Sequence, residues 1–324
     1  MTTTLNWGIL SSARINRRLI PAVKAATRST MLAVASRNQD KAQEYAAQWD
    51  IPRAYGSYEA LLAAPDINAV YIPLPNTLHK EWVIKAAQAG KHILCEKPLA
   101  MTVAEVDEMA AAAQENGVTL LEAFMYRMHP QLANLKALIA EGLIGRVKLV
   151  SAKFSFTLRD ENNIRLQKEM GGGALWDVGC YPVSFAQAIA EEDPQSVFGW
   201  QRVNASGADT LFAGQMQYRN GITAQIDAGF EIPFRAGAEV VGDKGVLSVP
   251  VPWIPDTEGN KSGLIHIAPD DTETRIPTEI KDPYLCEVEA LENAVLDGAP
   301  LLYTLAHSRG NVATINALYR SADG

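Results

Sequence analysis

The sequence predicts two domains, a doubly wound α/β domain with a parallel sheet followed by an α+β domain with a mostly antiparallel sheet. Strands and helices alternate over roughly the first 120 residues, which is typical of a parallel sheet. After Gly142 the strands follow one another with only turns between them, as at Asn220-Gly221. A chain of 324 residues also suits two cores better than one. We predict domains at residues 1–122 and 123–324, with a C-terminal helix able to pack back on the first.

Composition limits the partners and the compartment. The formal net charge of -8 argues against binding to nucleic acid or to an anionic membrane. No run of 18 apolar residues is present, and Leu5 begins a strand without a basic and apolar leader before it, so we predict a cytoplasmic protein. Cys95, Cys180 and Cys286 are far apart and form no metal-binding pattern, which argues against disulfides and structural zinc.

The first predicted strand, 5–10, leads into a turn of the kind that begins a dinucleotide-binding fold. The three positions that are usually glycine hold Ser11, Ala13 and Asn16. Small side chains still let a pyrophosphate approach, and serine hydroxyls can donate to its oxygens. An ordinary turn between a strand and a helix is the alternative. The candidate cofactor residues of this turn are Ser11, Ser12, Ala13, Arg14 and Ile15.

The next predicted strand, 31–35, ends in Ser36, Arg37 and Asn38, ahead of a helix over 40–49. An NAD enzyme usually carries an acid at this place, where it binds the ribose hydroxyls. A hydroxyl and a guanidinium suit a 2′-phosphate instead, so the three residues favour NADP, with NAD possible but less favoured. A solvated arginine at the start of a helix is the alternative for Arg37.

Two prolines extend the loop that follows the predicted strand 69–72. Such a loop can lie along a bound cofactor, where Asn76 and His79 offer polar contacts, and a helix follows it as far as Gly90. For His79 the alternative is a surface histidine without a role in binding. The candidate cofactor residues of the loop are Pro73, Leu74, Asn76 and His79.

The most informative stretch is the predicted strand 92–95 with the Glu96-Lys97-Pro98 that follows it. Open α/β sheets bind their ligands at the carboxyl ends of the strands. A half-buried ammonium at that edge needs a partner or a task, and Glu96 is the adjacent acid. A surface ion pair at the end of a strand is the alternative. A helix over 102–117 and a strand over 118–121 complete the predicted first domain.

The second predicted domain is rich in strands and contains no internal repeat. A helix ending near Gly142 precedes the strands, one helix over 174–189 interrupts them, and two helices over 284–295 and 305–319 close the chain. The predicted strands are 147–158, 196–204, 210–218, 222–230, 238–241 and 246–249.

The interrupting helix carries a second group of candidate residues. Gly171-Gly172-Gly173 introduces it, and Asp177 and Tyr181 follow with the i, i+4 spacing that places both on one face. A tyrosine is a usable general acid or base when a neighbouring ammonium lowers its pKa from about 10, and Lys97 is a candidate for that ammonium. The alternatives are that Asp177 only complements the helix dipole and that Tyr181 only packs on the sheet.

Taken together, these motifs resemble the Gfo/Idh/MocA family of oxidoreductases, named for glucose-fructose oxidoreductase and inositol dehydrogenase. Tyrosine at position 181, where many members have histidine, resembles the branch that holds NADP-dependent xylose dehydrogenase and dimeric dihydrodiol dehydrogenase. The resemblance covers essentially the whole chain. Its matching segments are the first turn, the loop 73–79, Glu96-Lys97-Pro98, Glu122–Pro130 and Gly171–Tyr181.

The resemblance implies a Rossmann domain joined to an open-faced antiparallel sheet, with a cis peptide before Pro98. It implies that Lys97 and Tyr181 are catalytic and that Asp177 orients the substrate. It adds Glu96, Lys97 and Arg127 to the cofactor residues. Substrate contacts are expected from Lys97, Asp177 and Tyr181 and from a wall of further residues, although plain packing is the alternative for at least half of that wall. The wall residues are Phe154, Phe156, Arg159, Arg165, Trp176 and Trp253.

The expected activity is hydride transfer between NADP and a carbohydrate, with an aldose 1-dehydrogenase for a xylose- or glucose-like sugar favoured. The alternatives are a trans-dihydrodiol dehydrogenase, a ketosugar reductase, and a sensor or regulator that binds NADP without turnover. The resemblance also implies a homodimer or homotetramer. Apolar groups on both faces of strands 210–218 and 222–230 would allow sheets to pair.

Overall fold

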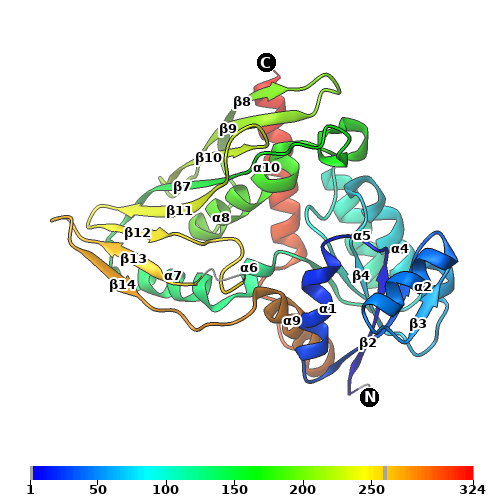
Figure 1. The fold of residues 1–324 in the computed structure, drawn as a ribbon. Coiled ribbons are helices and arrows are strands. Elements are labelled where there is room, and N and C mark those ends of the chain that lie inside the picture. The colour runs from blue at the N-terminus through cyan, green and yellow to red at the C-terminus, as the bar shows by residue number, and fades with distance from the viewer. Residues whose placement is uncertain (1–2, 258–260, 324) are drawn as a thin grey trace. The chain divides into compact units, whose positions relative to one another are not determined.

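A computed structural model describes residues 3–257 and 261–323 (Figure 1). The contacts divide the chain into two compact units. The first unit contains the residues up to Met128 together with Tyr284–Arg309, and the second contains His129–Pro283 and the residues from Gly310 onward. The single boundary predicted between residues 122 and 123 is therefore too simple, because a late segment belongs to the first unit.

Polar contacts join this late segment to the rest of the first unit. The guanidinium of Arg28 donates to the Asp297 carboxylate at 2.8 Å, and the Ser29 hydroxyl donates to Glu292 at 2.6 Å. Arg309 donates to Asp107 at 2.8 Å. These partners are more than 200 residues apart in the sequence, so no local pattern predicts that they meet.

The first unit is built on a parallel sheet with the strand order β3-β2-β1-β4-β5-β6, counted over the described residues. This is the order of a Rossmann fold, with its switch point between β1 and β4. Every predicted strand of the domain is present. Strand β3 was not predicted because it contains no buried apolar run, and the helix α3 was not predicted because five residues are too few to show a helical period. The strands are β1 Leu5–Leu10, β2 Ser29–Ala35, β3 Arg53–Tyr55, β4 Ala69–Ile72, β5 His92–Cys95 and β6 Leu120–Glu122.

The helices of the first unit follow the predicted alternation. A capping box begins α5, because the Thr102 hydroxyl accepts the Glu105 amide at 3.2 Å while the Glu105 carboxylate accepts the Thr102 amide at 3.1 Å. The helices are α1 Asn16–Ala25, α2 Gln39–Gln48, α3 Tyr58–Leu62, the 3₁₀ turn η1 Asn76–Leu78, α4 His79–Gln88, α5 Val103–Glu115, α6 Met125–Met128 and α9 Pro283–Asp297.

The second unit is built on a sheet with the order β14-β13-β12-β11-β7-β10-β9-β8 in the described part of the chain (Figure 1). Its neighbouring strands are antiparallel except for the pair β7 and β10, so the predicted mostly antiparallel sheet is confirmed. Strands β13 and β14 were not predicted. The strands are β7 Val147–Ser155, β8 Ser196–Val203, β9 Asp209–Gln217, β10 Thr223–Gly229, β11 Arg235–Gly242, β12 Val246–Val249, β13 Leu264–Ile267 and β14 Glu273–Ile276.

The helix predicted over 174–189 consists of two parts. A π-helical turn, η4, runs over Leu175–Gly179, and the α-helix α8 continues over Cys180–Ala190. Both parts pack on strands β7 and β10 (Figure 1). Isolated π-helical turns occur frequently at functional sites. The other helices of this unit are α7 Pro130–Ala140, the 3₁₀ turns η2 Ile164–Leu166 and η3 Lys168–Met170, and α10 Leu305–Ala322, which begins in the first unit.

The other face of the second sheet differs from the prediction. The outward positions of β9 and β10 are mostly polar, and Gln215, Gln217 and Gln225 are exposed there. The large apolar side chains lie on edge strand β8, where Phe198 and Trp200 are 65% and 52% exposed. The registers pair Phe198 with Gln215 and Trp200 with Ala213, so both aromatic groups share the outward face. The large exposed aromatic side chains of this face therefore lie at one edge, while the half-buried Leu149, Val241 and Val246 lie on the same face farther into the sheet.

Within residues 3–257 and 261–323, no helix combines the length and the apolar character that crossing a bilayer requires. The same residues contain no group of three or more histidine, cysteine or acidic side chains arranged to hold a metal ion.

Candidate active site

The first predicted cofactor turn follows β1 at the carboxyl end of the parallel sheet. Ser11 has a φ of 131°, a backbone region that normally favours glycine. The fully buried Asn16 stabilises this conformation because its side-chain amide donates to the Ser11 carbonyl oxygen at 2.8 Å. Asn16 thus supports a turn that lacks the usual glycines. Position 16 belongs to the predicted turn, but Asn16 was not predicted as a site residue.

The side chains of this turn and of the neighbouring strand end fit a phosphorylated nucleotide. Ser12 and Arg14 are exposed, and Arg37 is exposed where β2 ends. Ser36 is buried, and Asn38 caps α2 by accepting the Lys41 amide at 2.9 Å. Strands β1 and β2 are adjacent, so both turns lie at one edge of the sheet. Small side chains beside an exposed guanidinium provide room and positive charge for phosphate groups.

The loop after β4 departs from its prediction at His79. This histidine is fully buried, with its ring nitrogens 2.8 Å from the Leu74 carbonyl oxygen and 3.0 Å from the Pro98 carbonyl oxygen. Burial lowers the pKa of His79. The histidine therefore joins the loop to the segment after β5, and we correct its predicted role from contact with the cofactor to support of the loop. Pro73 and Leu74 are buried beside it, while Asn76 is half-buried.

The Lys97 segment is held by two carboxylates. Lys97 is half-buried, as predicted, and its peptide bond to Pro98 is cis, as the resemblance implied. Glu96 accepts a short hydrogen bond from the Tyr71 hydroxyl and a bond of 3.3 Å from the Lys97 backbone amide. Glu122, at the end of β6, accepts the Leu99 amide at 2.8 Å. The backbone around Lys97 is thus held by the adjacent Glu96 and by Glu122 from the neighbouring strand β6.

Glu122 is a buried acid of the first unit. Burial raises the pKa of Glu122 to about 7, against the effects of the Ser308 hydroxyl and the Leu99 amide, with a small opposing contribution from the charge of Lys97.

The Arg127 guanidinium, a predicted cofactor residue, lies 4.9 Å from the centre of the Tyr303 ring as a cation–π contact.

In the second unit, Gly172 and Gly173 precede η4 at a place where the chain is closely packed. Gly173 has a φ of 133°, and a Cβ atom there would lie 2.2 Å from an Asp209 carboxylate oxygen. A Cβ atom on Gly172 would lie 2.6 to 2.7 Å from three backbone carbonyl oxygens. The buried Asp209 accepts the Leu175 amide at 2.8 Å and the Tyr319 hydroxyl at 2.6 Å. Glycine is required at both positions because a buried carboxylate and the backbone occupy the space of a side chain.

The structure surrounds Tyr181 with aromatic rings. The ring centres of Phe154 and Trp253 lie 5.6 and 5.7 Å from that of Tyr181. Phe154 and Trp253 also stack on each other, with their planes 21° apart, and Phe185 meets Trp253 edge to face. Three predicted site residues from β7, α8 and the loop after β12 are therefore in contact.

Asp177 lies on the π-helical turn and forms an ion pair with Arg165, whose Nε donates to it at 2.7 Å. The structure thus brings these two predicted substrate residues together. The helix changes from π to α between Asp177 and Tyr181. The predicted α-helical i, i+4 spacing therefore does not apply to the face on which the two side chains lie.

The remaining wall residues divide between packing and exposure. Phe156 packs on the buried Phe230, with ring centres 5.2 Å apart. Trp176 is buried against Tyr319 of α10, which supports the packing alternative for it. Arg159 is exposed.

The first unit is a Rossmann fold with a candidate nucleotide-binding site at one edge of its sheet, and the second unit contains a tyrosine in an aromatic cluster. This combination defines a two-domain oxidoreductase architecture. Residues 5–124 match the family model "Oxidoreductase family, NAD-binding Rossmann fold", and residues 132–248 match "GFO/IDH/MocA C-terminal domain". The chain belongs to the Gfo/Idh/MocA family, and the predicted resemblance is confirmed.

Three relatives illustrate the family's range. The chain is 38% identical to D-xylose 1-dehydrogenase (NADP(+)) 2 of Haloferax volcanii, over 98% of this chain and 97% of that protein. It is 35% identical to trans-1,2-dihydrobenzene-1,2-diol dehydrogenase of Xenopus tropicalis, over 75% and 74%. A crystal structure of a 3-ketoreductase from Actinomadura kijaniata with NADP and TDP-benzene matches with a TM-score of 0.91 and 30% identity, over 98% of both chains.

The raised pKa of Glu122 predicts a pH-dependent stability. An acid whose pKa is higher in the folded state stabilises the fold fully below its unfolded pKa of about 4.5 and loses that contribution as the pH rises through about 7. Between these limits the free energy of unfolding should fall by about 3 kcal/mol because of this group. Glu122→Gln, which does not titrate, should flatten the decrease, as measured by urea denaturation at several pH values.

The exposed Glu115 provides the matched control. Glu115→Gln removes the same charge and should leave the decrease as in the wild type. Parallel curves for the wild type and Glu122→Gln would contradict the prediction.

Proposed function

We propose that this protein is an NADP-dependent aldose 1-dehydrogenase that oxidises the anomeric carbon of a xylose- or glucose-like sugar. The observation that carries the proposal is the setting of Tyr181, a hydroxyl held in an aromatic cluster beside Trp253. Aromatic faces suit the C–H faces of a sugar. The similarity to a D-xylose 1-dehydrogenase over nearly the whole chain supports the choice of substrate.

The cofactor would be held at the carboxyl edge of the first sheet. The turn from Ser11 to Ile15 would bind the pyrophosphate, and Arg37 with Ser36 would bind the 2′-phosphate. When bound, NADP supplies the nicotinamide carbon that accepts hydride from the sugar. The small side chains of the turn and the exposed Arg37 support this fit.

Tyr181 would act as the general base that removes the proton from the sugar hydroxyl. A tyrosine hydroxyl ordinarily titrates near pH 10, so a base that works near neutral pH needs a cation to stabilise its ionised form. In this proposal the ammonium of Lys97 provides that charge. Asp177 would accept hydrogen bonds from the sugar, and its ion pair with Arg165 fixes its carboxylate for this purpose.

A second candidate function is reduction of a ketosugar or oxidation of a trans-dihydrodiol. The similarities to the Xenopus diol dehydrogenase and the Actinomadura 3-ketoreductase favour it, and the rings of Phe154 and Trp253 would also accept a flat diol. A panel of aldoses, polyols, ketosugars and trans-dihydrodiols, assayed at the NADPH absorbance band with each cofactor, distinguishes these substrates. A sensor without turnover would bind NADPH and oxidise or reduce none of them.

Loss of the Tyr181 hydroxyl should remove most of the turnover. Tyr181→Phe should lower kcat by roughly two to four decades, about 3–5 kcal/mol, and leave NADPH affinity nearly unchanged. Lys97→Ala should act similarly, and the double variant should be little worse than either single one because the groups act together. Tyr218→Phe, at a buried hydroxyl, and Lys85→Ala, at a half-buried lysine paired with Glu81, are matched controls. Near-normal turnover by Tyr181→Phe would refute the assignment.

Arg37 should determine the preference for NADP. A contact between a guanidinium and a phosphate is worth roughly 1.5–3 kcal/mol, so Arg37→Ala should weaken NADP binding by one to two decades and NAD binding far less. Fluorescence titration with both reduced cofactors measures the difference. Arg219→Ala removes an exposed arginine of the second unit and should change neither affinity. Equal losses for both cofactors in Arg37→Ala would show a purely structural role.

The protein should form a homodimer or homotetramer through the exposed edge of the second sheet, where Phe198 and Trp200 lie. Light scattering should give a mass above that of the monomer. Trp200→Glu should lower that mass, whereas Leu302→Glu, at a 68% exposed leucine of the first unit, should not. A monomeric wild type at micromolar concentration would rule this out.

A further inference from the structure

The loop after β12 brings Trp253 to Tyr181 from a distant part of the sequence. Trp253 is 1% exposed, and its indole N–H donates to the Lys153 carbonyl oxygen at 3.1 Å. Within residues 250–257, here called the Trp253 segment, no helix or strand is present to hold this position. The position of the tryptophan therefore depends on contacts that the segment makes with other elements.

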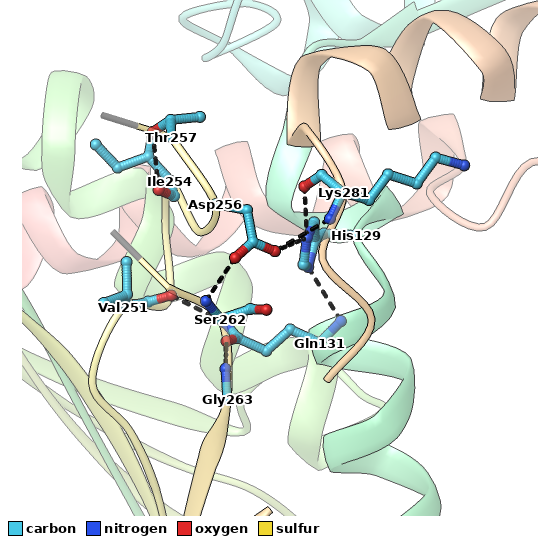
Figure 2. Close-up of polar contacts among 9 residues, drawn as sticks. All are labelled: His129, Gln131, Val251, Ile254, Asp256, Thr257, Ser262, Gly263 and Lys281. Carbon is cyan, nitrogen blue, oxygen red and sulfur yellow. Dashed lines mark hydrogen bonds and ion pairs between the residues drawn. The ribbon is translucent and has the colours of Figure 1, made fainter. Parts of the chain in front are cut away.

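The Gln131 side chain of α7 joins the Trp253 segment to Gly263, which comes directly before β13. The Gln131 side-chain amide donates to the Val251 carbonyl oxygen at 2.9 Å, and its oxygen accepts the Gly263 amide at 2.9 Å (Figure 2). Gln131 is only 4% exposed. A buried amide that is bonded at both its oxygen and its nitrogen is costly to displace, because each lost bond leaves a buried polar group unsatisfied.

Asp256 holds the segment from a second side. Its carboxylate accepts the Ser262 amide at 2.7 Å and the Lys281 amide at 3.1 Å, and it lies 3.2 Å from Nε2 of His129 (Figure 2). Burial would raise the pKa of Asp256, but the two amides hold it below its usual value. Asp256 itself has a φ of 56°, in the left-handed region that glycine favours and that aspartate adopts more often than most other residues.

His129 completes the contact network in a defined protonation state. Its Nδ1 accepts the Gln131 backbone amide at 3.1 Å, so the proton lies on Nε2, which faces Asp256 and the Lys281 carbonyl oxygen at 2.9 Å. Burial lowers the pKa of His129 and favours this neutral form. The start of α7 is thereby fixed, and Gln131 is fixed with it.

We propose that Gln131 and Asp256 are positioning residues for Tyr181: they fix the Trp253 segment so that the indole ring holds the Tyr181 ring in its reactive orientation. The inference rests on the proposed role of Tyr181 as general base. It identifies residues on α7 and in the loop after β12 that act only through Trp253. A loosened segment would let the Tyr181 ring tilt, and small misplacements of reacting groups are costly to catalysis.

The main test uses Gln131→Met, which keeps the length of the side chain and removes both hydrogen bonds to the loop. The expected result is a roughly ten- to hundredfold lower kcat with an unchanged Kd for NADPH. Asn134→Ala is the matched control. Asn134 is also an amide of α7, and its side chain donates to the Pro277 carbonyl oxygen at 3.4 Å and not to Val251 or Gly263. Its kcat should equal that of the wild type.

A double-mutant cycle separates positioning from general weakening of the structure. Trp253→Phe alone should lower kcat, and adding Gln131→Met to it should lower kcat little further, because both changes act through the same ring. Independent, multiplicative losses would overturn the proposal. Should Gln131→Met not fold, Asp256→Asn combined with Trp253→Phe gives the same cycle with the same two outcomes.

A measurement without turnover keeps the inference distinct from the proposed function. The quenching of Trp253 fluorescence by acrylamide is obtained by subtracting the quenching of each protein's Trp253→Phe counterpart from that of the protein itself. This difference should increase in Gln131→Met and not in Asn134→Ala. If Tyr181→Phe retains turnover, the role of Tyr181 fails, while the quenching still shows whether Gln131 fixes the segment. Increased quenching with an unchanged kcat would overturn the positioning role alone.

Discussion

The start of the helix that carries Asp177 and Tyr181 depends on one buried carboxylate, that of Asp209. It accepts the Leu175 amide and the Tyr319 hydroxyl, and it occupies the space that a side chain on Gly173 would need. A buried carboxylate without such donors would be unstable. The glycines, the π-helical turn and the contact with α10 are therefore parts of one arrangement that determines where the candidate base lies in the second unit.

The first unit uses the same principle at the end of β5. Lys97 lies in a segment whose backbone is bonded to Glu96 before the lysine and to Glu122 after it, while His79 meets the Pro98 carbonyl oxygen. Each of these supporting side chains comes from the end of a strand or the start of a helix. The backbone that carries Lys97 is therefore held at the carboxyl end of the sheet, where open α/β sheets bind their ligands.

The Trp253 segment completes the surroundings of Tyr181 by a different route. It follows the last regular strand that the sequence predicted, and its order comes from Gln131 and Asp256 rather than from its own backbone pairing. Polar contacts of this kind specify one arrangement of a loop, because any other arrangement leaves buried donors and acceptors unpaired. The contact of Trp253 with Tyr181 is hydrophobic, whereas the contacts of Gln131 and Asp256 that fix the Trp253 segment are polar.

The sequence by itself determined the two domain types, most of the strands, the first turn, and the places of Lys97 after a strand and of Tyr181 on a helix. These features depend on local periodicity and on motifs a few residues long. The short strands β3 and β14 were not predicted, because they lack the buried apolar run that marks an equally short strand such as β5. Only the tertiary structure showed that Asn16 replaces the glycines of the turn, that His79 is a buried support, and that residues 284–309 belong to the first unit. The contacts of Asp256 with His129 and of Gln131 with Val251 join residues more than 100 positions apart. Such pairs are decided by how the chain packs, and no local pattern records them.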